Sequence, residues 1–214
     1  MKKLSLLILM IGLLAVDNSA QNNDGDFREN LLFGLKIGAN YSNVYDSEGE
    51  EFKTDPRLGL VFGAFLAVPV GKYLGIQPEV LFSQKGFNAT GRILGSPYKF
   101  TRTTSYIDVP LLIQFKPGKF ITLMAGPQYS FLIKQSDVFE SASLSFEQEQ
   151  EFENDNIRKN TFCFIGGFDI NYNHFVFGAR VGWDILNNNG DGTTTTPRYK
   201  NFWYQATIGL RLYN

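Results

Sequence analysis

YIDVPLLIQFKPGKFITLMAGPQYSFLIKQS, residues 106–136, is the stretch that decides the fold. Apolar and polar residues alternate along it on both sides of a Pro117-Gly118 turn, and a period of two is typical of a β-strand. The apolar face comprises Ile107, Val109, Leu111, Ile113, Phe115, Ile121, Leu123, Ala125, Tyr129, Phe131 and Ile133. The opposite face of the second strand comprises Thr122, Met124, Gly126, Gln128, Ser130 and Lys134. The pattern predicts two antiparallel strands of roughly ten residues or more, longer than the five or six usual in soluble sheets.

Two kinds of β protein fit this alternation. A soluble sandwich or barrel buries its apolar face and turns the polar face to water. A membrane barrel does the reverse, because its apolar face meets lipid and its polar face lines a narrow lumen. The rest of the chain has to separate the two.

The same alternation recurs along the chain and predicts eight strands. We expect them at about 32–45, 57–68, 73–87, 100–116, 119–136, 157–172, 175–186 and 199–214, with a bulge at Pro78. Long loops at 46–56, 88–99, 137–156 and 187–197 alternate strictly with short turns. Outer-membrane barrels have this arrangement, with an even number of strands, short periplasmic turns and long external loops. We therefore expect an all-β protein, an eight-stranded antiparallel up-and-down transmembrane β-barrel.

Charged residues on the polar, Gly-rich face of the predicted strands favour the membrane barrel over a soluble one. They are Lys36, Glu79, Lys85, Asp108, Asp169, Arg180, Asp184 and Arg211. The interior of an eight-stranded barrel is just wide enough for side chains to fill, and buried charges there have to be paired. We expect a lumenal charge network and a mostly plugged lumen. The 20 Phe and 10 Tyr suit a lipid-facing surface better than the core of a soluble lipocalin-like barrel.

The N-terminus predicts export. Lys2 and Lys3 precede an apolar run, and Ser19-Ala20 offers a cleavage point, so residues 1–20 read as a cleaved signal peptide. Residues 21–31 form a polar, flexible lead, and residues 32–214 form the barrel. The expected location is the bacterial outer membrane.

Few residues suggest chemistry. The net charge of -1 argues against nucleic acid as a partner. The single Cys163 cannot form an intramolecular disulfide, and we expect it to pack inside. No common hydrolase, zinc or phosphate-loop motif is present, and the lone His174 falls in a predicted short turn. We therefore expect no catalytic residue, cofactor or metal, although the acidic loop 140–155 could attract divalent cations as well as water.

Glu79 and Asp108 leave one enzymatic alternative. Both point inward from neighbouring predicted strands, and paired carboxylates can perform acid/base chemistry. A structural ion-pair network with Lys36, Arg180 or Arg211 explains the same residues, and we favour it.

The chain resembles the PorT-like outer-membrane β-barrel family of Bacteroidetes-type bacteria. The matching stretches are FGLKIGANYSNV, IQPEVLFSQKG, YIDVPLLIQF, AGPQYSFLI, FGARVGWDI and QATIGLRL, in order over the whole mature chain. The resemblance implies an eight-stranded Gram-negative outer-membrane barrel. It also implies a link to protein secretion, because the protein after which the family is named takes part in secretion.

The expected function is non-enzymatic: a structural or surface-interaction protein with long external loops. Its expected partners are outer-membrane lipid and lipopolysaccharide and, through the loops, a protein, with the barrel itself a monomer. The alternatives are an outer-membrane enzyme that uses lumenal carboxylates and a soluble periplasmic ligand-binding barrel.

Overall fold

The computed structural model describes residues 26–46, 54–93, 96–141, 145–150, 158–188 and 199–212. Within these ranges the strands are β1 (Leu32–Asp46), β2 (Thr54–Pro69), β3 (Leu74–Ile93), β4 (Ser96–Phe115), β5 (Ile121–Ser141), β6 (Ser145–Gln150), β7 (Asn160–Tyr172), β8 (Phe175–Asp184) and β9 (Tyr199–Leu212). No helix among the described residues is long and apolar enough to cross a bilayer. The predicted signal peptide, residues 1–20, lies outside the described residues.

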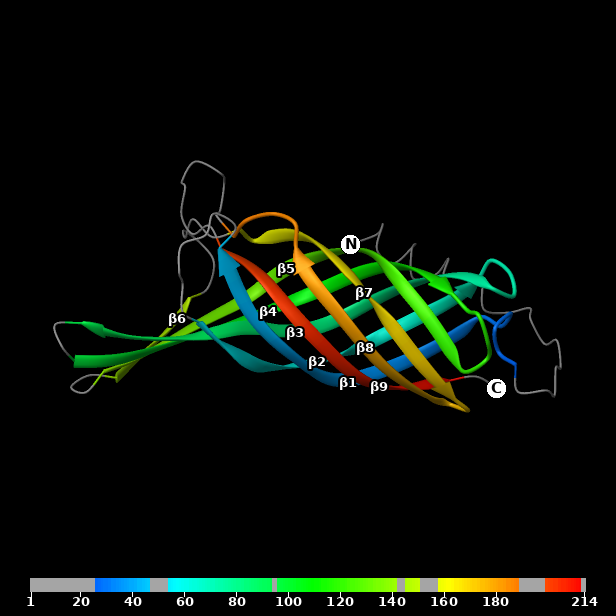
Figure 1. Ribbon diagram of the computed structural model, residues 1–214, viewed down its shortest axis with the longest axis horizontal. Helices are drawn as coiled ribbons and strands as arrows, with labels where there is room; N and C mark the ends of the chain where they lie inside the picture. Colours follow the sequence, from blue (N-terminus) through cyan, green and yellow to red (C-terminus); the bar gives the residue numbers. More distant parts are fainter. Residues whose placement is uncertain are drawn as a thin grey trace, which may run out of the picture.

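Eight of these strands close into a ring (Figure 1). Each of β1 to β5 pairs antiparallel with the next, β5 then pairs with β7, and β7, β8 and β9 follow in order. The pairing of β9 with β1 completes the ring. The short β6 adds to the far end of β5 and stands outside the ring. The predicted eight-stranded antiparallel barrel is therefore confirmed.

The two faces of the barrel wall separate as the alternation predicts. Ile37 on β1, Ile113 on β4 and Ile208 on β9 are 58%, 66% and 53% exposed. Leu112, the neighbour of Ile113 along the strand, is fully buried inside. Because the apolar face is the outer one, lipid rather than a protein core must cover it.

Three strands run further than the sequence predicts (Figure 1). The β3–β4 ladder continues to Ile93 opposite Ser96, and the β4–β5 ladder continues to Tyr98 opposite Ser141. Residues 88–93, 96–99, 137–141 and 145–150, which were predicted to be loop, are thus strand, and β6 was missed. Beyond the bilayer the outer face no longer has to be apolar, so the period-two signal fades although the backbone pairing continues.

Two expectations about register were wrong. Pro78 causes no bulge, because β3 keeps one register with β4 on both sides of it. One irregularity lies instead where Ser105 faces Lys134 but Tyr106 faces Leu132, which leaves Ile133 as an extra residue in β5. Another lies in β2, between Pro56 and Val61. Lys134 was expected on the inward face with Gln128 and Ser130, yet the bulge in β5 turns it outward and leaves it exposed.

Ile37→Arg tests the lipid-facing surface. An arginine on the lipid face near the bilayer midplane costs about 2–4 kcal/mol of folding free energy. Val70, 68% exposed in the short turn between β2 and β3, provides the matched control, and Val70→Arg should cost less than about 0.5 kcal/mol. Denaturant unfolding in phospholipid vesicles measures both. Equal small effects would contradict a lipid-covered face at Ile37.

Candidate functional site

Glycines on the inner wall make room for long charged side chains. Lys36 on β1 lies opposite Gly63 on β2 and Gly209 on β9. Without a side chain on either neighbour, Lys36 can lie along the wall and reach past β2. The Gly-rich polar face in the sequence is therefore the space that the charges occupy.

Glu79 on β3 is the centre of the interior. Its Oε1 lies 2.8 Å from Nζ of Lys36, and its Oε2 lies 2.8 Å from Nη1 of Arg180 on β8. Arg180 Nη2 also donates to Glu79 Oε1 at 3.0 Å and lies 3.7 Å from Asp169 Oδ1. All four side chains are buried. Two cations and two carboxylates thus neutralise each other in the middle of the barrel, as buried charges require.

A second ion pair lies nearer the extended end of the barrel. Lys85 Nζ is 3.1 Å from Asp108 Oδ2, and both side chains are almost fully buried. The ammonium also lies 3.8 Å from the ring centroid of Trp203 and 4.9 Å from that of Tyr106, a cation–π arrangement. We missed Trp203 as a site residue, although its position two residues before Gln205 on β9 places it on the inner face.

Asp184 accepts hydrogen bonds from neutral groups. Asp184 accepts a hydrogen bond from Sγ of Cys163 at 3.1 Å and another from the backbone N–H of Asn201 at 3.0 Å. Cys163 is buried, as expected for a packing residue. Arg211 lies at the end of the barrel where the short turns are and donates to Oδ1 of Asn171.

The carboxylates of Glu79 and Asp108 do not face each other. The β3–β4 register places Asp108 opposite Leu81, and each carboxylate has its own cation. Among the described residues no group of three or more His, Cys, Asp or Glu side chains could hold a metal ion. His174 lies exposed in the turn between β7 and β8. The arrangement favours neutralisation and packing over acid/base chemistry.

Glu79→Gln tests this assignment. The change leaves Lys36 and Arg180 buried without their shared carboxylate, which should cost about 3–5 kcal/mol of unfolding free energy. The control is Glu140→Gln, because Glu140 forms a longer 3.8 Å pair with Lys99 and both side chains are half exposed. That change should cost less than about 1 kcal/mol. A Glu79→Gln barrel of unchanged stability would contradict the structural role and favour the enzymatic alternative.

Comparison with known proteins agrees with this architecture. The model of the family "Outer membrane protein beta-barrel domain" matches residues 19–189, well over half of the chain. No curated protein matches the sequence significantly.

Solved structures of similar shape include Ail, the attachment invasion locus protein of Yersinia pestis, at 13% identity and a TM-score of 0.48. The alignment covers 85% of this chain and 99% of Ail. Neisserial surface protein A follows at 10% identity and a TM-score of 0.47, over 84% of this chain and 97% of that one. OprG from Pseudomonas aeruginosa has 12% identity and a TM-score of 0.41, over 87% and 98%.

At these scores the solved structures carry no inference about this chain, so the assignment rests on the family model and on the closed ring of strands. The chain belongs to the outer membrane protein β-barrel domain family and is a protein of the bacterial outer membrane.

Proposed function

We propose that this chain is a non-enzymatic outer-membrane barrel with a filled interior that presents an extension of its wall to a protein partner outside the cell. The observation that carries the proposal is the continuation of β3, β4 and β5 past the rest of the ring (Figure 1). With β6 at the edge, these strands form a sheet of their own beyond the barrel.

The extension is long enough to stand clear of the bilayer. From Ser96 to Ser105, β4 runs nine residue steps, which correspond to about 30 Å of strand. It projects at the end away from the short turns, which are periplasmic in barrels of this kind (Figure 1). A protein outside the cell would have access to this sheet.

Aromatic and arginine side chains lie along the extension. Tyr98 and Phe139 stack with their ring centroids 5.6 Å apart. Arg102 holds Asp137 through two hydrogen bonds of 2.8 and 2.6 Å and lies 5.3 Å from the ring centroid of Phe100. Such residues dominate the binding energy of protein interfaces, which supports a partner site here.

The interior supports a closed, non-enzymatic barrel. Glu79, Asp108 and Asp169 all lie beside buried cations, so these carboxylates already serve to balance charge. Large side chains such as Trp203 and Leu81 are fully buried among them. Filling of this kind favours a plugged lumen.

The outer face of the barrel and the closure of its ring support a set of molecular surroundings. The exposed apolar face fits outer-membrane lipid and lipopolysaccharide, and the ring closes within one chain, which supports a monomer. The resemblance to the PorT-like family supports protein secretion as the process in which the external partner takes part.

Site-specific photo-crosslinking in intact cells tests the proposal. A photoreactive phenylalanine in place of Tyr98, on the extension, should give a discrete protein adduct of higher mass. The same probe in place of Phe120, which is 57% exposed at the short-turn end, is the matched control and should not give that adduct. Absence of any adduct from Tyr98, Phe100 and Phe139 in correctly folded barrels would contradict the proposal.

A further inference from the structure

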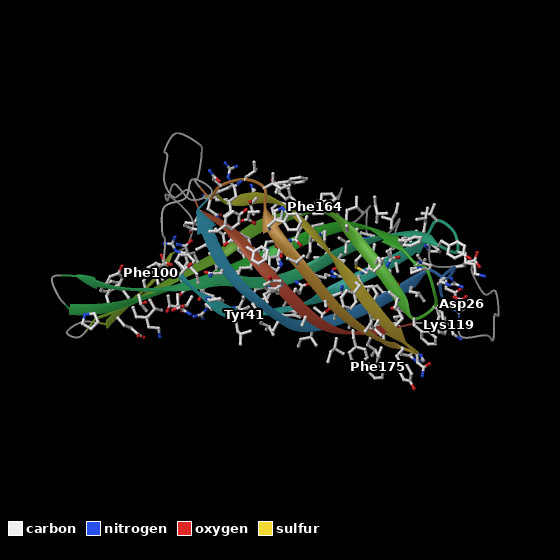
Figure 2. The ribbon with its side chains drawn as sticks, in the orientation of Figure 1. Asp26, Tyr41, Phe100, Lys119, Phe164 and Phe175 are labelled. Carbon is white, nitrogen blue, oxygen red and sulfur yellow. The ribbon has the colours of Figure 1, made fainter. Side chains whose placement is uncertain are left out.

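The segment before β1 reaches over the mouth of the barrel at the short-turn end. Residues 26–30 form a turn in which the N–H of Asn30 donates to the carbonyl of Phe27 at 3.2 Å. Figure 2 shows Asp26 and Lys119 at this same end of the molecule. The turn takes no part in the ladders of the ring, because those of β1 begin only at Leu32. Its position therefore depends on contacts with other parts of the wall.

Arg28 fastens the turn to the wall at two places. Its backbone carbonyl accepts a hydrogen bond of 2.9 Å from Nζ of Lys116, the residue directly after β4. Its guanidinium lies 5.5 Å from the ring centroid of Tyr73, the residue directly before β3, and pairs with Asp26 inside the turn at 2.6 Å. Because the turn leads into β1 but is held beside β3 and β4, it spans the opening between these parts of the wall.

Polar side chains at the mouth are buried beneath this turn. Gln114, Thr122 and Asn171 lie near the short-turn ends of β4, β5 and β7, yet they are only 3%, 4% and 7% exposed. Together with Phe27 and Arg28 of the turn they line a cavity of about 20 Å³, which has room for about one water molecule. Inward-facing residues at an open barrel end would face water, so the turn acts as a close-fitting cover.

We propose that residues 26–30 form a lid on the periplasmic mouth, and that this lid opens while the barrel stays folded. The strands of the ring are held by continuous ladders of backbone hydrogen bonds, whereas Arg28 holds the lid through two side chains of the wall, Lys116 and Tyr73. Segments outside such ladders open locally at a far lower free energy than the whole domain. Opening would admit water as far as Thr122 and leave the charges around Glu79 closed.

Cysteine accessibility in the full-length folded barrel tests the lid. Thr122→Cys places a thiol beneath the lid, and its labelling by N-ethylmaleimide is followed by the mass of the intact protein. Because labelling requires the open form, its rate follows the population of that form. The rate should be at least about tenfold lower than for His174→Cys, which lies exposed in the turn between β7 and β8 at the same end.

Arg28→Ala loosens the lid without changing the barrel wall. It removes the contact with Tyr73 and the pair with Asp26, so it should speed the labelling of Thr122→Cys about threefold or more. Lys119→Ala is the matched control, because Lys119 lines the same cavity and lies 5.2 Å from the ring centroid of Phe120 but is not part of the lid. The control should leave the rate unchanged. Each change removes one positive charge near the thiol, so an effect of charge on thiol ionisation is common to both.

The native Cys163 reports any opening of the barrel as a whole. It is buried in the interior and should stay unlabelled in every variant. If the gel mobility of boiled and unboiled samples shows that Thr122→Cys does not fold, Gln114→Cys beneath the lid on β4 provides the same measurement. Three results would overturn the proposal: labelling of the covered thiol as fast as that of His174→Cys, equal rates with and without Arg28→Ala, or labelling of Cys163 together with the covered thiol.

Discussion

In the hydrocarbon of a bilayer a backbone amide has only other backbone groups to bind, so a sheet that crosses it has to close. Here β9 meets β1, and β4 and β5 join the two halves of the wall. Closing eight strands leaves an interior that only side chains can fill. Since the apolar side chains are needed on the lipid face, the alternate positions that point inward are polar. The interior therefore has to satisfy its own charges, which it does around Glu79.

The glycines on the inner wall follow from the same need to fit and pair charged side chains inside the barrel. Lys36 reaches Glu79 because Gly63 and Gly209 stand opposite it, and Gly167 likewise faces Arg180 on β8. The centre is neutral, because Lys36, Lys85 and Arg180 each lie beside a carboxylate.

The alternation in residues 106–136 predicted the strand type and, apart from Lys134, the facing of the central hairpin, because lipid imposes a period-two pattern. The same alternation along the rest of the chain was needed to predict the closed barrel. It did not reveal the extension, since that pattern ends where the lipid ends. Seven of the eight charged residues named from the sequence are buried in the interior, all except Arg211. Their partners could not be predicted, because Arg180 and Glu79 lie on β8 and β3, and only the closed ring brings them together. The outward turn of Lys134 depends on one extra residue in β5, which no sequence pattern marks.

The central claim is that the interior around Glu79 is filled and neutral. Its most direct test is single-channel recording of the purified, folded protein in planar lipid bilayers. We predict no steady conductance, because Lys36, Arg180 and Asp169 pack around Glu79 in the middle of the barrel. Stable, porin-like conductance steps from the wild-type protein would contradict the account and show that water and ions pass through the barrel.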